Sequence, residues 1–284
     1  GVNFDATSTV GSSNLNLAAN QNLDIGRRSN DTNYFGGAYG EIIIYATRLN
    51  DHEREAVEAY LRAKWQKGVD GISTTGLNLH LDPMKQKTLM TDINATSCDA
   101  STHTVAGNGD DVSCILDRSP KANHAGQATI ANRPLLNTTG LNSLSALTFD
   151  GTNDYLSGQA VGFDGGDSAM TLNQFFDVNT TGNLSFSLGN VDSAKQRWML
   201  NLKFDTQINH DYSGAGVYYG SLADLTTAPP IGITAVYNGA GVQVAANQPL
   251  YINGISQTST ATGGGSSGAA LMAADPNYYI GVNI

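Results

Sequence analysis

The sequence predicts an all-β protein, a sandwich or jelly roll that carries one short helix. Glycine is abundant, with 32 of 284 residues, while only 14% of the residues are charged. That composition is typical of short strands joined by polar turns. Apolar and β-branched stretches recur between Gly- and Asn-rich segments, and only one segment has helical periodicity. A chain of this length can hold one large or two small domains.

The first predicted strands lie between Leu23 and Ile44 and are separated by a polar turn at residues 29–33. Within this region Glu41–Tyr45 is the strongest strand signal, because it is β-branched and nearly continuously apolar. Strands that are covered on both faces have this character. We therefore expect residues 41–45 to form a central strand.

One helix is predicted over residues 51–67. Asn50 or Asp51 is suited to cap its N-terminus, Glu53 stands where a capping box places a glutamate, and Leu49 can staple the entry. Large apolar residues then recur at helical spacing. They are Val57, Tyr60, Leu61 and Trp65. Their burial would contribute roughly 6–10 kcal/mol in total, so this face needs another surface to cover it.

A connector at residues 68–76 leads to Leu77–Asp82, whose alternating pattern predicts a half-buried strand. Residues 250–255 contain Asn253-Gly254, a strong hairpin signal. Further strands are predicted at residues 113–116, 146–149, 184–188, 198–204, 216–219, 231–236 and 242–244.

The end of the sequence repeats its beginning. Residues 251–284 align with residues 1–34 at an offset of 250 residues at the start of the motif and 255 at its end. A period of this length fits one large domain per repeat. We therefore expect the chain to start inside one copy of a domain and to stop inside the next, as part of an array.

Two parts of the chain carry motifs of one known family. Residues 25–65 hold Ile-Gly, the strand Glu-Ile-Ile-Ile-Tyr, and the helix that ends in Lys-Trp. Residues 79–155 hold Asp-Arg-Ser-Pro, Asn-His-Ala, and Phe-Asp-Gly-Thr-Asn-Asp-Tyr. These stretches are similar to the end and the beginning, respectively, of the concanavalin-A-like jelly rolls of laminin-G type found in bacterial surface, pilin-like and phage proteins. The chain lacks the tryptophan that these domains often have near Ile115.

The resemblance implies a two-sheet concanavalin-A-like jelly-roll sandwich, with the domain order permuted along the chain. Residues 1–67 would be the C-terminal part of one domain, and residues 77–284 the N-terminal part of the next. The resemblance also implies an extracellular location and a binding or scaffolding role. It does not identify a ligand.

Neither part has a full set of core-forming strands, so each supplies what the other lacks. Two arrangements are open: closure within one chain, or completion of a neighbouring sandwich by residues 1–67. The second arrangement is heterologous and builds a filament if its rotation does not close. The residues expected at such an assembly interface are Ile43, Val57, Tyr60, Leu61 and Trp65.

Charge and cysteine content narrow the class of protein. The net charge is −10 and no basic residue follows Lys203, which argues against binding to nucleic acid. The longest apolar runs are too short for a membrane span. Cys98 and Cys114 could close a loop worth roughly 3 kcal/mol in an oxidising compartment. Two free buried thiols are the alternative, and the Asn-, Thr- and Ser-rich composition favours an extracellular location.

The sequence does not predict an enzyme. Glycosidases on this type of fold need two carboxylates that flank the bond, but no glutamate follows Glu58. There is no Gly-X-Ser-X-Gly elbow, and the five histidines lack metal-ligand spacing. We therefore expect a non-enzymatic protein.

Two kinds of binding site remain as candidates. Calcium takes oxygen ligands from acidic loops, and the candidate ligands are Asp110, Asp111, Asp150 and Asp154. Ordinary turn formation by Asp is the alternative. A glycan would need an exposed aromatic platform, for which the candidates are Tyr212, Tyr218 and Tyr219. Core packing is the alternative for these tyrosines.

The function that the sequence favours is an extracellular structural repeat that assembles head-to-tail with copies of itself into a fibre or surface appendage. A lectin-like adhesion module that binds glycans, with or without calcium, is the alternative.

Overall fold

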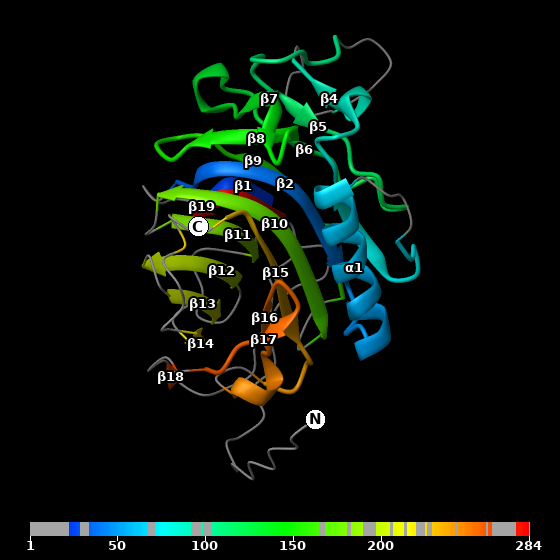
Figure 1. Ribbon diagram of the computed structural model, residues 1–284, viewed down its shortest axis with the longest axis vertical. Helices are drawn as coiled ribbons and strands as arrows, with labels where there is room; N and C mark the ends of the chain where they lie inside the picture. The colour runs from blue at the N-terminus through cyan, green and yellow to red at the C-terminus, as the bar shows by residue number, and fades with distance from the viewer. Residues whose placement is uncertain are drawn as a thin grey trace.

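The computed structural model describes residues 23–28, 34–67, 72–91, 98, 104–164, 168–180, 183–189, 197–204, 207–212, 215–219, 225, 229–241, 244–259, 261–262 and 277–283. In this part of the chain two β-sheets pack against each other, and one α-helix covers the outer face of one sheet (Figure 1). The predicted all-β sandwich with one helix is confirmed. The jelly-roll and concanavalin-A-like topology stays a prediction.

The smaller sheet has eight described strands in the order β17-β16-β15-β10-β2-β8-β7, with β3 beside β2. Its strands are β2 (Gly36–Tyr45), β3 (Leu77–Leu81), β7 (Leu135–Leu141), β8 (Leu144–Asp150), β10 (Met170–Thr180), β15 (Ile231–Tyr237), β16 (Leu250–Ile252) and β17 (Ile255–Ser256). β10 pairs with one edge of β2, while β8 and β3 divide the other edge between them. The predicted central strand is therefore confirmed as β2.

The larger sheet has eleven described strands in the order β18-β14-β13-β12-β11-β1-β19-β9-β6-β5-β4. They are β1 (Leu23–Arg28), β4 (Leu89–Met90), β5 (Cys114–Ile115), β6 (Ala125–Gly126), β9 (Leu156–Gln159), β11 (Asn183–Gly189), β12 (Arg197–Phe204), β13 (Gln207–Tyr212), β14 (Ala215–Tyr219), β18 (Ala261–Thr262) and β19 (Asn277–Asn283). The described pairs are antiparallel except for β1 and β19, which run parallel. Short 3₁₀ turns lie at Gln86–Thr88, Ile130–Asn132 and Ala245–Asn247.

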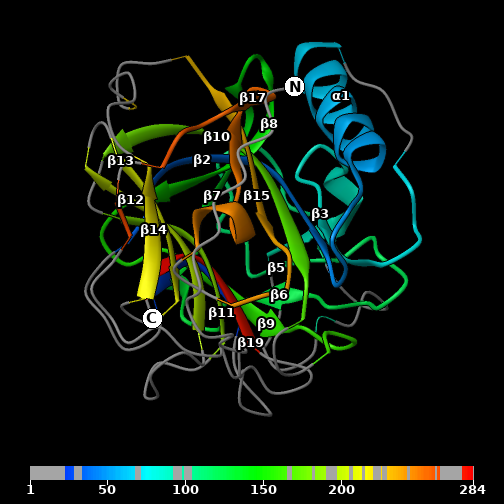
Figure 2. The same ribbon diagram turned by 90° about the horizontal axis from the view of Figure 1, so that it is seen from below.

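β2 is apolar along its length because it lies between two cores. Ile42 and Ile44 belong to the core between the sheets, whereas Ile43 and Tyr45 belong to the core beneath the helix. Successive side chains of a strand point to opposite faces. A continuous apolar run is therefore what a strand covered on both faces requires. In Figure 2 the smaller sheet lies between the helix and the strands β12 to β14.

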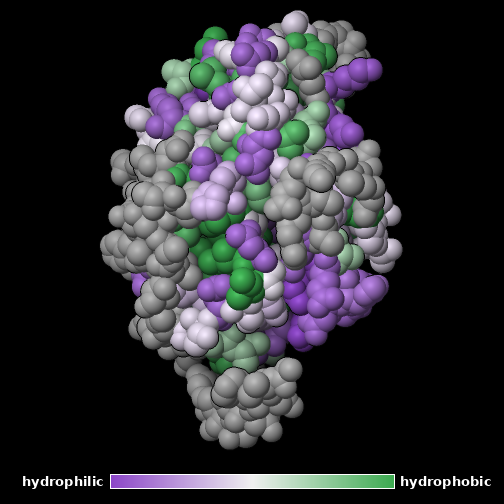
Figure 3. Space-filling model, viewed as in Figure 1, coloured by the Kyte–Doolittle hydropathy of each residue, from purple (hydrophilic) through white to green (hydrophobic). Residues whose placement is uncertain are grey.

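The helix α1 spans Asp51–Lys67 and begins with the predicted capping box. The backbone N–H of Asn50 donates to Glu53 Oε2, and the N–H of Glu53 donates to Asn50 Oδ1, both at 2.9 Å. Trp65 is fully buried and stacks on Phe175 of β10, with ring centroids 5.5 Å apart. The opposite face of α1 is solvent-exposed, and hydrophilic residues gather over this side of the molecule in Figure 3.

The residues predicted at an interface between neighbouring chains lie instead in the core of their own chain. Ile43, Val57, Tyr60, Leu61 and Trp65 are all buried in the core between α1 and the smaller sheet of their own chain. The reason is that β2 is hydrogen-bonded into that sheet between β10, β8 and β3. In this structure the chain's own smaller sheet covers this surface.

Several strands followed the prediction and others did not. The hairpin at Asn253-Gly254 is formed, with φ of 50° and 79° at the two turn residues. The predicted strand at residues 242–244 lies mostly outside the described residues. Strand β10 was missed because its interior is polar. Its buried Asn173 accepts a hydrogen bond from Thr234 Oγ1 at 2.8 Å, and its buried Gln174 donates to Tyr39 Oη at 3.3 Å.

Candidate functional site

The two copies of the repeated sequence motif lie side by side in the larger sheet. β1 and β19 are parallel partners, with Asp24 opposite Tyr279 and Ile25 opposite Ile280. The residues that pair are those that the sequence repeat aligns at an offset of 255. The structure therefore places equivalent positions of the two copies next to each other.

Both copies pair with the same neighbours. Ser187 of β11 is the antiparallel partner of Asp24 in β1 and also of Tyr279 in β19. β9 likewise pairs with β1 through Leu156 and with β19 through Gln159. The other edge of β11 is taken by β12. β1 and β19 therefore lie together between β11 and β9, and each of them pairs with both of these strands; we call this place the shared slot.

The shared slot belongs to the main core. Ile25 and Ile280 are 2% and 0% exposed, and both lie in the core between the sheets. Tyr278 is also fully buried, and its hydroxyl donates to the carbonyl of Asn123 at 2.5 Å. Burial raises the pKa of Tyr278 well above its ordinary value, and the charge of Asp117 adds to this effect. An apolar strand is therefore needed in the slot.

The acidic residues predicted to bind calcium form ordinary turns. Asp150 Oδ1 accepts hydrogen bonds from the backbone N–H groups of Thr152, Asn153 and Asp154, at 2.8 to 3.2 Å. Asp154 Oδ2 accepts from the N–H of Asp150 at 3.0 Å. These contacts are those of an Asx turn. The structure brings Asp150, Asp154 and Asp111 into one neighbourhood, and a calcium site there stays a prediction.

The other predicted calcium ligand lies in a separate turn. Asp110 is exposed, and its Oδ2 accepts from the N–H of Gly107 at 2.7 Å. Asp111 forms an isolated β-bridge with Leu135.

The tyrosines predicted as a glycan platform lie on β13 and β14. The prediction is wrong for Tyr219, which is 1% exposed and donates its hydroxyl proton to the carbonyl of Gln248. Tyr219 faces the core because β14 buries alternate residues, Val217 and Tyr219, against the smaller sheet. The side chains of Tyr212 and Tyr218 lie outside the described part of the structure.

The predicted disulfide is confirmed. Cys98 and Cys114 are bonded to each other, with their Cα atoms 6.0 Å apart, so the alternative of two free thiols is excluded. A hollow of about 330 Å³ lies beside it, lined by polar residues that include Asn123, His124 and Gln159. No aromatic residue is among its described lining residues.

A buried ionic cluster lies between α1 and the paired strands β2 and β3. Ile42 of β2 pairs with Leu81 of β3 in an antiparallel register. Glu41 therefore lies next to Asp82, the residue that follows β3. Both carboxylates are 0% exposed, and Lys64 of α1 is 2% exposed. Lys64 Nζ lies 2.6 Å from Asp82 Oδ2 and 3.0 Å from Glu41 Oε2.

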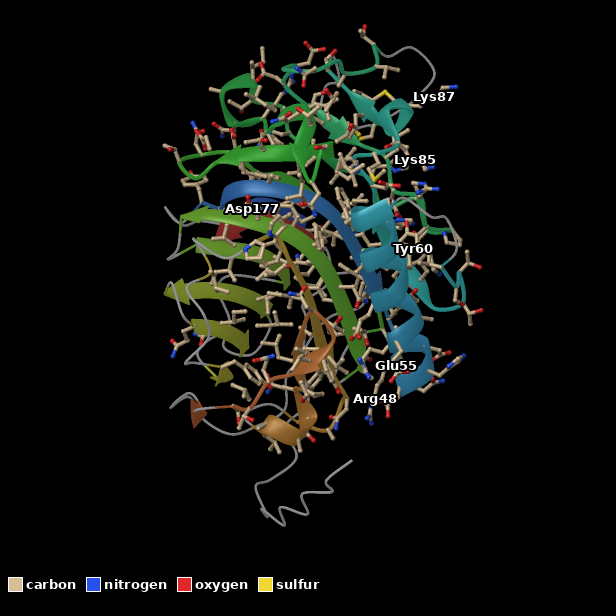
Figure 4. The ribbon with its side chains drawn as sticks, in the orientation of Figure 1. Arg48, Glu55, Tyr60, Lys85, Lys87 and Asp177 are labelled. Carbon is tan, nitrogen blue, oxygen red and sulfur yellow. A yellow bond between two sulfur atoms is a disulfide. The ribbon has the colours of Figure 1, made fainter. Side chains whose placement is uncertain are left out.

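Other polar groups complete this ionic cluster. Arg118 Nη1 donates to Asp82 Oδ2 at 2.6 Å. Glu41 accepts hydrogen bonds from the Tyr60 hydroxyl at 2.9 Å and from Trp65 Nε1 at 3.3 Å, and it also contacts His80 Nε2. Figure 4 labels Tyr60 midway along α1, with Arg48 and Glu55 near the start of the helix and Lys85 and Lys87 after β3.

Two opposing effects act on the pKa of Glu41. Burial alone would raise this pKa, but the hydrogen bond from His80 and the charges of His80 and Lys64 outweigh burial, so the pKa is lowered. Burial also raises the pKa of Tyr60, and the charges of Glu41 and Asp82 raise it further. Glu41 is therefore a carboxylate and Tyr60 a neutral donor at ordinary pH.

The ionic cluster contains three potential metal ligands, Glu41, His80 and Asp82, which lie within 4.8 Å of one another. Their carboxylate oxygens are already occupied by the nitrogen atoms of Lys64 and Arg118. A metal cation would have to displace these two positive groups. The arrangement suits a balanced set of side-chain charges better than it suits a metal.

The sequence places Lys64 in the predicted helix and His80 in the predicted strand Leu77–Asp82, but it does not join them. Charged residues stand at positions where apolar ones were expected: Glu41 in the central strand and Lys64 on the buried face of the helix. This was the available signal. What the sequence could not show is that α1 lies over the end of β3, where Asp82 and Arg118 complete the cluster.

Comparisons with known proteins do not identify a family. No protein-family model, curated protein or solved structure matches the chain. The likeness to laminin-G-type domains therefore rests on the motifs given above and stays a prediction. In the described part of the chain no helix is both long and apolar enough to cross a membrane.

Proposed function

We propose that this chain is a non-enzymatic extracellular structural repeat that assembles head-to-tail with copies of itself. The single observation that carries this proposal is the shared slot, for which the chain supplies two equivalent strands. Each of the two strands pairs with both β11 and β9, so one of them alone could close the slot. The other is then available to fill the same slot in a neighbouring copy.

Strand exchange through this slot would be specific and strong. A donated strand gains main-chain hydrogen bonds along two edges and buries an apolar residue, Ile25 or Ile280, in the core. Because the donor and acceptor surfaces differ, the contact is heterologous and can propagate as a filament. The proposed exchange is confined to the duplicated strand, since β2 and α1 are built into their own sandwich.

An extracellular location is supported by the disulfide between Cys98 and Cys114, because such bonds persist in oxidising compartments. The glycan-binding alternative is less well supported. It requires an exposed aromatic platform, and Tyr219 is buried.

Proline substitutions test the proposal, because proline removes a ladder hydrogen bond and is not tolerated in a central strand. We expect the wild-type chain to form oligomers whose size grows with concentration, measured by light scattering and electron microscopy. Ile25→Pro and Ile280→Pro should each yield folded monomers, since the remaining copy fills its own slot. The double variant should lose the cooperative fold.

The matched control is Ile255→Pro, a strand residue that is 68% exposed at the edge of the other sheet. It should assemble like the wild type. A wild-type chain that stays monomeric at every concentration would contradict the proposal. So would oligomers that survive unchanged in both single variants.

A further inference from the structure

The buried ionic cluster places an amine directly against a carboxyl group. Lys64 Nζ lies 2.6 Å from Asp82 Oδ2, and both side chains are at most 3% exposed. This distance joins Nζ to a carboxyl oxygen. The amine therefore touches the group whose carbon, Cγ, it would attack from about 3–3.5 Å.

A proton carrier stands beside the same nitrogen. Glu41 Oε2 is 3.0 Å from Lys64 Nζ, and the carboxylate is held in place by Tyr60 and Trp65. General acid–base catalysis requires this reach, about 2.6–3.2 Å between heavy atoms. Arg118 Nη1 is 2.6 Å from Asp82 Oδ2, where it can stabilise negative charge that develops on this carboxyl group during attack.

Water has little access to the pair. Lys64 and Asp82 are buried, and the rings of Tyr60 and Trp65 lie 5.5 and 5.8 Å from Lys64 Nζ. Transfer of one proton from the ammonium to the carboxylate converts the ion pair into an amine and a carboxylic acid. The amine is the nucleophile and the acid is the electrophile.

We propose that Lys64 and Asp82 condense spontaneously into an intramolecular amide bond, with Glu41 as the proton carrier. Lys64 Nζ forms a bond to Asp82 Cγ, and one carboxyl oxygen leaves as water. Of the three ammonium protons one stays on the amide nitrogen, and Glu41 delivers two to the departing oxygen. The positive and negative charges of the pair cancel, so the step needs no oxidant, reductant or other reactant.

The product leaves the core electrically balanced. Glu41 keeps its negative charge and Arg118 its positive charge, while the new amide is neutral. The bond ties α1 to the end of β3, on either side of the connector at residues 68–76. Such a tie would hold the outer helix on the sandwich when a repeat is pulled from its ends, although the bond itself does not depend on strand exchange.

Mass spectrometry of the intact wild-type chain tests the proposal directly. After reduction of the disulfide, the chain should weigh less than its sequence predicts by the mass of one water molecule. Trypsin cleaves after lysine only when the side-chain amine is free. The digest should therefore lack cleavage between Lys64 and Trp65 and should contain one branched peptide that joins the segments of Lys64 and Asp82.

Two variants separate the amide bond from the ion pair. Lys64→Arg keeps the positive charge but cannot form the amide, so its mass should equal that of its sequence. Glu41→Gln removes the proton carrier and should show little or no loss of water. Lys121→Arg, at an exposed lysine, is the matched control and should keep the full deficit.

The proposal would be overturned if the folded wild-type chain had the full mass of its sequence and its digest contained a linear tryptic peptide that ends at Lys64. The cluster would then be an ion-pair network. A water deficit that persists in Lys64→Arg would also overturn the proposal, because the bond would then lie elsewhere. Neither result bears on strand exchange, which the proline variants test separately.

Discussion

Asp117 shows how much structure one carboxylate can organise. Its Oδ1 accepts hydrogen bonds from the N–H groups of His80 and Ser119, at 2.7 and 2.9 Å. Its Oδ2 accepts from the Ser119 hydroxyl at 2.5 Å and from the N–H of Asn123 at 2.8 Å. Burial raises the pKa of Asp117, and these hydrogen bonds oppose that effect. The side chain thereby fixes the loop after β5 against β3.

We predict that Asp117→Ala destabilises the protein by roughly 3–5 kcal/mol, because it leaves several buried donors without an acceptor. Urea unfolding, followed by circular dichroism, measures the change. Asp110→Ala is the control, because Asp110 is exposed and its side chain accepts a hydrogen bond from the Gly107 N–H that water can replace. Its effect should stay within about 1 kcal/mol. Equal midpoints for the two variants would show that Asp117 does not have this role.

Asp154 provides a pH-dependent contribution to stability. Burial raises its pKa from the ordinary 3.8 to about 7; the charges of Asp150 and Asp111 add to this effect, and a backbone hydrogen bond opposes it. Between these two pH values the folded state holds a proton that the unfolded state has lost. Stability from this group is therefore present at low pH and is lost as pH rises toward 7.

We predict that Asp154→Asn, which mimics the protonated side chain, removes this dependence. The melting temperature of the variant, relative to that of the wild type, should be higher at pH 7.5 than at pH 5. Comparison with the wild type cancels the titration of the other carboxylates. Parallel melting curves for the two proteins would mean that Asp154 is ionised in the folded state throughout.

At the scale of elements, the contact between β2 and α1 depends on one glycine. A Cβ atom on Gly40 would lie 2.6 Å from Trp65 Cζ2, on a ring that is fully buried and stacked against Phe175. The ring cannot move away without disturbing β10. Gly40 therefore permits the close approach of helix and sheet.

We predict that Gly40→Ala destabilises the protein by about 1–3 kcal/mol through overpacking. Gly232→Ala is the matched control, because a Cβ there would meet its nearest neighbour at an ordinary 3.5 Å in β15. Thermal unfolding of both variants measures the difference. If Gly232→Ala proved the more harmful substitution, the tight packing of Trp65 on β2 would not be the limiting contact.

Local signals were enough to locate α1 but not all of the strands. The Asn50–Glu53 box and the spacing of Val57, Leu61 and Trp65 act within a few residues, so the sequence pattern shows them. β10 carries buried polar residues whose partners, Thr234 and Tyr39, are distant in sequence. A sequence pattern cannot distinguish such a strand from a polar loop, because the hydrogen bonds that allow these polar side chains to be buried join residues far apart in the sequence.

At the scale of the whole molecule, the disulfide ties Cys98 to the larger sheet. Cys114 is in β5, and Cys98 precedes it by 16 residues. A loop of this length gives a stabilisation of about 3 kcal/mol in the chain-entropy model.

We predict that reduction, or replacement of both cysteines by serine, lowers the stability by about 2–4 kcal/mol. Thermal unfolding with and without reductant measures the change. The serine variant serves as the control, since reductant should not affect it. A wild-type melting curve that reductant leaves unmoved, with both thiols shown to be free, would show that the bond contributes nothing to stability.

By itself the sequence determined the class of the fold, the central strand, the capped helix, the disulfide pair and the repeat between its two ends. These follow from periodicity, turn chemistry and residue spacing, which act locally or can be compared directly along the chain. Only the tertiary structure decided that β1 and β19 share one slot and that Lys64, Glu41 and Asp82 meet beneath α1. Both features arise from the position of one element against another, which the packing of the whole core determines.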